Sequence, residues 1–306
     1  MASALLGNLG RALVSRGALG AAGVGVGLVA LKGTVTVAHA HQEGGGAAEQ
    51  EEKVGLSPKE FRPFPLLHKE QITANTALYR FGLADQDTAL GLTVASLLMT
   101  KATVGEEAVV RPYTPTTSPS TKGYFDLIIK TYPTGKMGNH FAGLKVGDTV
   151  DMKGPFVKID YKPNYKKKIG MIAGGTGITP MYQVLTEILA NEADMTEVSL
   201  LYGNITEQDI ILKGELDKLA ASHSNFKLTY ILDKPPAGWA GAAGYVTADL
   251  VTKHMPPPAA DNLVLVCGPP PMMVAISGNK NPDKSQGDVT GILAGLGYDS
   301  SNVYKF

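Results

Sequence analysis

The chain has 306 residues, which is enough for about two domains. A hydrophobic fraction of 44% and a charged fraction of 18% suit a chain that buries a core, and they exclude a disordered protein. The 28 basic residues balance the 28 acidic ones, which argues against a general nucleic-acid binder. The single cysteine, Cys267, excludes an intramolecular disulfide and a cysteine-rich metal site, so we expect no metal.

Residues 1–42 have a composition unlike the rest of the chain. They hold three basic residues and no acidic one, so the remainder carries 25 basic and 28 acidic groups. Four leucines would share one face of a helix: Leu5, Leu6, Leu9 and Leu13. This pattern is typical of a mitochondrial transit peptide, with a secretory signal peptide as the alternative. We therefore expect residues 1–42 to be a targeting or membrane-anchor segment that brings the protein to the mitochondrial outer membrane or intermembrane space.

Glycines and glutamates dominate the stretch that follows, so residues 43–60 are expected to be a linker. From residue 61 onward, short apolar segments alternate with glycine and proline, which favours β-strands. The expected strands are 66–72, 77–83, 93–101, 107–113, 124–132 and 148–161, with one short helix near 137–144. Six strands joined by turns predict a closed antiparallel β-barrel over residues 61–165.

Residues 166–306 follow a different pattern, in which apolar strands alternate with helices. The expected strands are 169–173, 197–202, 227–232 and 262–267, and the expected helices are 180–190, 209–222 and 248–254. Such alternation predicts a doubly wound parallel α/β sheet of the Rossmann type. The sequence thus predicts two architectures in series, an all-β half and an α/β half.

The stretch KIGMIAGGTGITP (residues 168–180) runs from an apolar strand through glycines into a helix. Gly174, Gly175 and Gly177 would let the backbone approach a pyrophosphate, to which free helix N–H groups donate. We expect Thr179 to be the helix N-cap, with Pro180 in the first turn. A glycine turn after a strand is also common as a plain connection, so the motif needs support from elsewhere.

Two further residues stand where expected strands end. An acid at the end of a strand, here Asp233, accepts from a ribose 2′-OH and repels a 2′-phosphate, which favours NAD over NADP. The alternative for Asp233 is a turn cap ahead of Lys234. Cys267 ends an apolar strand at the ligand-binding edge of the sheet, followed by Gly268 and Pro269. By itself this thiol is equally well explained as a small core hydrophobe.

In this order and after a β-rich half, these motifs resemble those of the ferredoxin–NADP reductase-like flavoproteins. More closely, the chain is similar to the NADH–cytochrome b5 reductase family, in particular its mitochondrial type. The resemblance covers about residues 61–306. The matching strings are RPYTPT (111–116), FDLIIKTY (125–132), GKMG (135–138), GGTGITP (174–180), LDKPP (232–236) and CGPPP (267–271).

The resemblance implies an FAD-binding barrel followed by an NAD-binding domain, in an enzyme that uses FAD and NADH. Such an enzyme takes a hydride from NADH and passes single electrons to cytochrome b5 or a similar acidic haem protein. Two rivals remain open. One is a reductase of the same fold for another acceptor, such as an iron–sulfur protein or a quinone; the other is a non-catalytic scaffold attached to a membrane.

The resemblance also implies contacts to FAD. Arg111 would hold the diphosphate, Tyr113 would pack on the flavin ring, and Thr114 would bond to its polar edge or ribityl chain. Without the resemblance, an Arg–Tyr pair on one strand face is usually a surface pair. Further implied FAD contacts are Pro112, Ile128, Ile129, Tyr132, Gly135, Lys136, Met137 and Gly138. The family commonly has serine where Gly138 stands, and many members have a Gly-Gln/His pair near residues 94–96.

On the NADH side, the glycine turn with Thr176 would seat the nucleotide, and Asp233 would hold its ribose. The implied catalytic set is Cys267, Thr179 and Lys130, with Gly268 and Pro269 beside the nicotinamide. An acidic haem partner implies a basic docking face, for which Lys136, Lys162 and the run 166–168 are candidates. The run is equally well explained as a solvated linker. We expect a monomer.

Overall fold

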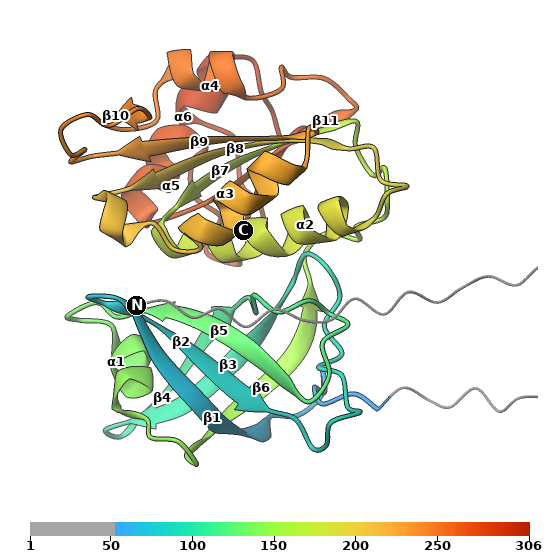
Figure 1. Cartoon of the computed structure of the whole chain (residues 1–306), viewed down its shortest axis with the longest axis vertical. Helices are drawn as coiled ribbons and strands as arrows, with labels where there is room; N and C mark the ends of the chain where they lie inside the picture. The colour runs from blue at the N-terminus through green and yellow to red at the C-terminus, as the bar shows by residue number, and fades with distance from the viewer. Residues whose placement is uncertain (1–52) are drawn as a thin grey trace, which may run out of the picture. The chain divides into compact units, whose positions relative to one another are not determined.

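A computed structural model describes residues 53–306 (Figure 1). The predicted targeting segment and most of the predicted linker lie outside the described residues. Two six-stranded sheets follow one another along this part of the chain, the first antiparallel and the second parallel. No helix within residues 53–306 is both long enough and apolar enough to cross a membrane.

The antiparallel sheet has the strand order β4-β3-β6-β1-β2-β5. Alternate side chains of its strands point into a core that holds Phe81, Phe125 and Phe141. The helix α1 (Lys136–Gly143) covers one end of this core through Phe141. The strands are β1 (Arg62–Thr73), β2 (Thr76–Gly82), β3 (Ser96–Val104), β4 (Glu107–Tyr113), β5 (Tyr124–Lys130) and β6 (Thr149–Val157).

The two edge strands of this sheet, β4 and β5, are not paired as a ladder, so strand pairing does not close the expected barrel. One backbone hydrogen bond joins the two segments, from the Thr116 amide to the Asp126 carbonyl at 3.0 Å. Beyond it lies a gap, between Arg111–Thr114 on one side and Ile128–Lys130 on the other. Backbone N–H and C=O groups on the facing edges of β4 and β5 are therefore available to hydrogen-bond with a ligand or with water.

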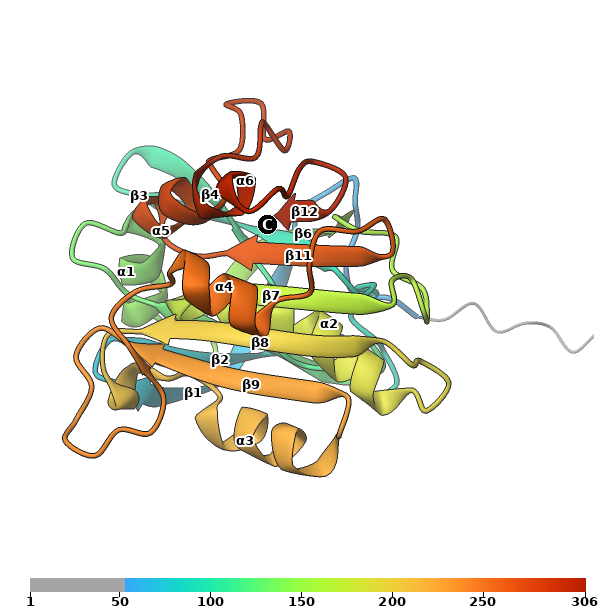
Figure 2. The same ribbon diagram turned by 90° about the horizontal axis from the view of Figure 1, so that it is seen from above.

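The parallel sheet has the order β10-β9-β8-β7-β11-β12; Figure 2 shows its strands from β9 to β12, and β10 is labelled in Figure 1. The chain first builds outward from β7 to β10 and then returns to place β11 on the other side of β7, so a topological switch point lies between β7 and β11. The strands are β7 (Lys168–Gly174), β8 (Glu197–Asn204), β9 (Phe226–Leu232), β10 (Ala242–Ala243), β11 (Asn262–Cys267) and β12 (Val303–Lys305).

Helices cover both faces of the parallel sheet (Figure 1). The helix α2 lies on the face toward the antiparallel half, whereas α4, α5 and α6 pack on the opposite face. The α2 core also contains Ala95, Ile128 and Ile159, so the two halves share buried contacts. The helices are α2 (Ile178–Ala190), α3 (Lys213–Ser222), α4 (Ala248–His254), α5 (Pro270–Ile276) and α6 (Gly291–Gly295), with short 3₁₀ turns η1 (Gly175–Gly177) and η2 (Glu207–Asp209).

The structure confirms the predicted fold class, an antiparallel half followed by a doubly wound parallel half. Four elements have no counterpart in the prediction, namely β10, α5, α6 and β12. The predicted N-cap is wrong. The helix α2 begins at Ile178 with Gly177 as its N-cap, and Thr179 lies inside the first turn, where its hydroxyl donates to the Thr176 carbonyl at 3.2 Å.

Candidate active site

A cleft of about 770 Å³ lies between the antiparallel half and the parallel half. Its walls are the β4–β5 gap, the start of α1, and the turns that follow β7 and β11. Nineteen of the residues predicted for the site line it: Arg111, Pro112, Tyr113, Thr114, Ile128, Ile129, Lys130, Tyr132, Gly135, Lys136, Met137, Gly138, Gly174, Thr176, Gly177, Thr179, Cys267, Gly268 and Pro269. Gly175 and Asp233 are not among the lining residues.

The antiparallel wall presents an aromatic ring and a cation on one segment. The Tyr113 ring stands edge-on to Phe141 with the ring centroids 5.5 Å apart, which holds it against the core of the sheet. Burial raises the pKa of Tyr113 to about 12, so its hydroxyl stays protonated at neutral pH. Arg111 is exposed and donates to the Val110 carbonyl, and no acidic residue within 53–306 forms an ion pair with it.

Two helices begin at this cleft, and neither has a side-chain cap. The helix α1 follows Gly135 and α2 follows Gly177, and neither carries an acidic residue in its first turn. At α1 no side chain accepts from the first N–H groups, whereas at α2 the Ile178 N–H already donates to the carbonyls of Gly175 and Thr176. At both helix starts the helix dipole favours a negative charge. FAD and NADH each carry one diphosphate. Each wall of the cleft thus offers one site for an anion, which matches one diphosphate from each of the two cofactors. The residues present therefore fit both FAD and NADH.

The glycine turn after β7 packs so tightly that side chains are excluded. A Cβ on Gly177 would lie 2.1 Å from the Cys267 carbonyl oxygen, and a Cβ on Gly174 would lie 2.4 Å from the sulfur of Met272. Gly175 has a φ of 53°, which favours glycine, and its carbonyl accepts a 3.0 Å hydrogen bond from the buried Tyr202 hydroxyl. The Tyr202 hydroxyl thus holds the turn in place, and Gly174, Thr176 and Gly177 of the turn line the cleft.

Cys267 ends β11 on the other side of the switch point. It is partly exposed at the cleft, yet burial raises the pKa of its thiol to about 12. The thiol is therefore protonated at neutral pH and is a poor nucleophile. A neutral sulfur beside the glycine turn is suited to packing against a flat ring rather than to covalent chemistry.

An ion pair joins the two halves at the cleft. The Lys130 ammonium lies 4.0 Å from a carboxylate oxygen of Asp209, and the two side chains are 13% and 22% exposed. Lys130 ends β5, whereas Asp209 lies in η2, where its carboxylate accepts hydrogen bonds from the backbone and hydroxyl of Thr206. Lys130 thus lies in the wall of the cleft and contacts the parallel half, and its role beside the cofactors stays a prediction.

Asp233 lies at the same edge of the parallel sheet but outside the cleft. It follows β9, two strands from β7, which corresponds to about 10 Å at the usual strand spacing. The nearby Asp233 carboxylate raises the pKa of the exposed Tyr245 hydroxyl. The contact of Asp233 with a ribose stays a prediction.

Five residues line the cleft that the sequence reasoning missed. Leu97 follows the segment near residues 94–96 that departs from the family pattern, so that departure is the signal that marked it. Phe306 follows β12, a strand that was not predicted. Pro180 and Pro270 lie inside the motifs GGTGITP and CGPPP but were not assigned a role in the site, and Thr134 directly precedes the motif GKMG.

The lysine run at residues 166–168 does not lie at the cleft. Lys168 begins β7 and the cleft lies beyond its last residue, about 20 Å away for a strand of this length. Lys168 forms a 3.0 Å ion pair with Glu197, and Lys166 donates to the Ala260 carbonyl. The run therefore lies at the edge of the parallel sheet opposite the cleft.

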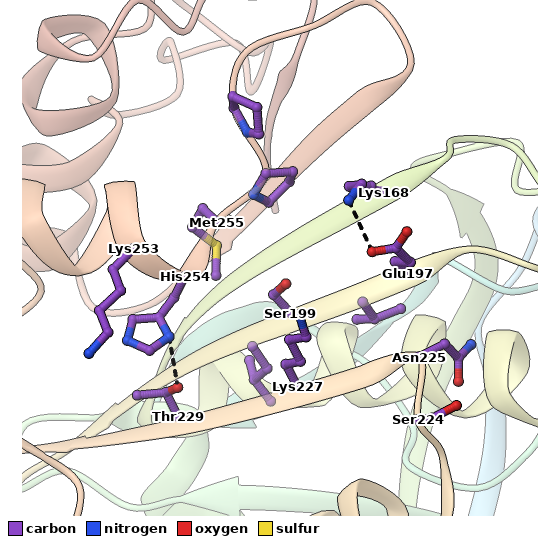
Figure 3. Close-up of a pocket in the computed structure, with 14 residues that line it drawn as sticks. Lys168, Glu197, Ser199, Ser224, Asn225, Lys227, Thr229, Lys253, His254 and Met255 are labelled. Atoms are coloured by element: carbon purple, nitrogen blue, oxygen red, sulfur yellow. Dashed lines mark hydrogen bonds and ion pairs between the residues drawn. The ribbon is translucent and has the colours of Figure 1, made fainter.

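A second hollow of about 330 Å³ lies at that opposite edge, between the parallel sheet and the end of α4 (Figure 3). Its polar groups are partly paired with one another, Lys168 with Glu197 and Thr229 with His254. Across residues 53–306, no group of three or more His, Cys, Asp or Glu side chains is placed to hold a metal ion.

The antiparallel half has the features of a flavin site, the parallel half has those of a dinucleotide site, and the two share one cleft. These features define the class of the protein, which is a two-domain oxidoreductase that binds FAD and NAD. Sequence comparison agrees, because residues 63–161 match the oxidoreductase FAD-binding domain and residues 171–278 match the oxidoreductase NAD-binding domain. Among solved structures, the cytochrome b5 reductase domain of Ulva prolifera nitrate reductase matches with a TM-score of 0.72 and 35% identity, over 83% of this chain and all of that one.

Comparison with two similar proteins shows to which oxidoreductase family the chain belongs. The chain is 51% identical to the NADH-cytochrome b5 reductase-like protein of Arabidopsis thaliana, over 83% of this chain and 79% of that protein. It is 42% identical to NADH-cytochrome b5 reductase 1 of Dictyostelium discoideum, over 89% of this chain and 92% of that protein. The chain belongs to the NADH–cytochrome b5 reductase family.

Proposed function

We propose that this protein takes a hydride from NADH and passes electrons singly to cytochrome b5 or a similar acidic haem protein. The observation that carries the proposal is the shared cleft, in which the β4–β5 gap faces the glycine turn and Cys267. The names of the relatives support the choice of acceptor. FAD supplies the chemistry when bound, because it accepts two electrons as a hydride and releases them one at a time.

The protein's own residues bind and orient the cofactors. Tyr113 and the unpaired backbone of the gap would hold the flavin ring, while Arg111 and the start of α1 would hold its diphosphate. The glycine turn and the start of α2 would hold the diphosphate of NADH. Cys267 and Thr179, on neighbouring turns, would border the nicotinamide.

No general base is needed for this transfer, and the site is built accordingly. The thiol of Cys267 and the hydroxyl of Tyr113 both have pKa values of about 12, so both stay neutral at physiological pH. The role that we propose for these side chains is therefore to position the cofactors. Reactants that a protein holds in the correct orientation react much faster than reactants that meet by diffusion.

The acceptor would approach where cations stand beside the cleft. Lys136 begins α1, is half exposed, and forms an ion pair with Glu107, while Arg111 lies on the same wall. An acidic haem partner would be attracted to these charges, and the attraction would weaken with salt because the Debye length falls to about 8 Å at physiological ionic strength.

The test uses the purified full chain. We expect bound FAD that is released on denaturation, bleaching of the flavin colour by NADH without oxygen, and NADH-dependent reduction of cytochrome b5 that slows as salt is raised. A flavin-free protein, or one whose flavin NADH does not reduce, would overturn the proposal. Reduction of ferricyanide or a quinone without reduction of cytochrome b5 would overturn the proposed acceptor only.

The cellular location is a proposal of its own. The basic, acid-free composition of residues 1–42 supports delivery to mitochondria, with retention at the outer membrane or in the intermembrane space. A fluorescent protein carrying residues 1–42 should enter mitochondria, and replacing Arg11 and Arg16 with glutamate should abolish entry. Secretion of the fusion, or its even spread through the cytosol, would contradict the proposal.

A further inference from the structure

The second-last residue of the chain, Lys305, is a charged side chain that is fully buried. Its ammonium donates to three backbone carbonyls, those of Asn279 at 3.1 Å, Gly287 at 3.3 Å and Asp288 at 2.9 Å. An ammonium has three donors, and here all three are used. Burial lowers the pKa of Lys305, and no carboxylate within the described chain forms an ion pair with it.

The carbonyls belong to a loop, residues 278–290, that contains no helix or strand. A second contact ties this loop to β12. The Gln286 side chain accepts from the Lys305 backbone N–H at 2.7 Å and donates to the Lys305 carbonyl at 3.0 Å. The Gln286 amide thus makes the two backbone hydrogen bonds that a neighbouring strand would otherwise make with Lys305. Five hydrogen bonds from one residue join the loop to the end of β12.

The next residue along the chain, Phe306, lines the cofactor cleft. Its N–H donates to the Val266 carbonyl at 3.0 Å, one residue before Cys267. Its ring stands edge-on to Tyr304 at a centroid distance of 5.2 Å, and the Lys280 ammonium lies 5.7 Å from the centre of the Tyr304 ring. The position of the Phe306 ring therefore depends on how firmly β12 is held.

We infer that Lys305, together with Gln286, is a positioning residue for hydride transfer: its buried ammonium fixes β12 to the loop and so holds Phe306 in the wall where the nicotinamide must lie. Burying an ammonium is costly even when all its hydrogen bonds are made. A hydrophobic residue would anchor a β-strand at lower cost, and the lysine instead fastens the strand to an irregular loop through that loop's own carbonyls. The inference rests on the proposed function.

The experiment measures the rate of flavin reduction by NADH in rapid-mixing experiments without oxygen, together with flavin content and the thermal midpoint. The variants are Lys305→Met, Phe306→Ala and their double variant. Lys284→Met, at an exposed residue of the same loop, is the matched control. We expect Lys305→Met and Phe306→Ala each to lower the reduction rate about tenfold with FAD retained, because a misplacement of 1 Å costs about 100-fold and a smaller shift correspondingly less.

The double variant distinguishes positioning from general stability. If Lys305 acts through Phe306, the double variant should be no slower than Phe306→Ala alone, because the two changes remove the same arrangement. Rates that multiply in the double variant, or a Lys305→Met rate equal to that of Lys284→Met, would overturn the inference. If Lys305→Met does not fold, Gln286→Ala, which keeps the carbonyl cage, takes its place with the same expectation of non-additivity. A wild-type protein whose flavin NADH does not reduce would instead contradict the proposed function.

Discussion

Gly177 is the position where one added carbon atom should do the most damage. A Cβ there would lie 2.1 Å from the carbonyl oxygen of Cys267 and 2.5 Å from its carbon, whereas ordinary contacts begin at 3.4 Å. The glycine turn and the end of β11 would have to separate by about 1.3 Å. Both neighbours are backbone, so no side-chain rotation relieves the clash. Gly177 has a φ of −61° and a ψ of −8°, which alanine adopts freely, so the effect of Gly177→Ala is purely steric.

The cost follows from that displacement. Overpacking typically costs about 1–3 kcal/mol, of which about 0.4–1 kcal/mol is offset because alanine restricts the unfolded chain. We expect the thermal midpoint to fall by about 2–8 °C, given roughly 2–4 °C per kcal/mol for a chain of this size. A 1 Å misplacement costs about 100-fold in rate, so kcat/KM for NADH should fall about that much.

The assay compares NADH-dependent ferricyanide reduction, flavin content and thermal unfolding in Gly177→Ala and in wild type. Flavin content should be unchanged, because the proposed FAD diphosphate site lies at the start of α1 on the other wall. Gly214→Ala is the control, since Gly214 is exposed in α3 with no atom within 4 Å of the added Cβ. A kcat/KM for Gly177→Ala within threefold of wild type would refute the reasoning.

Three further changes test separate parts of the site. Asp233→Ala should reduce the preference for NADH over NADPH about tenfold, or about 1.4 kcal/mol, in steady-state rates; an unchanged ratio would give Asp233 another role. Tyr202→Phe should cost about 1 kcal/mol in chemical denaturation and raise KM for NADH, because the Gly175 carbonyl loses its donor; an unchanged KM would exclude that support. The pKa of Cys267 is about 12, against about 8.5 for a free thiol, so its alkylation at pH 8 should be about 10³-fold slower than that of a free thiol. The alkylation rate should rise about tenfold per pH unit up to pH 11. Alkylation at the rate of a free thiol would contradict the burial of Cys267.

The fold was predictable because its long elements carry strong periodic patterns. The apolar strands that became β7 and β11, and the amphipathic helix that became α2, appear in the sequence with little error in their bounds. The prolines after Cys267 were identified as part of a motif, but no helix was predicted there. In the structure they begin α5, where a missing N–H costs nothing.

The short elements depend on tertiary contacts, and local sequence does not encode those. The three-residue strand β12 exists only because β11 lies beside it, and α6 has only five residues. For the same reason Phe306 was missed as a cleft residue, although every string motif on the cleft walls was found. Gly138 illustrates the limit at a single residue. An added Cβ there would lie 3.1 Å from the Lys130 carbonyl oxygen, so a serine would require a shift of a few tenths of an ångström, which the local sequence does not reveal.

The gap between β4 and β5 has a consequence outside catalysis. An unpaired strand edge attracts the edge of any other chain, which is how aggregates begin. In this fold the proposed flavin site lies along that gap. A newly synthesised chain without bound flavin would therefore expose two unpaired strand edges, β4 and β5, to other chains. Shortage of riboflavin would then reduce the amount of surviving protein, while each copy that had captured its flavin would work at full speed.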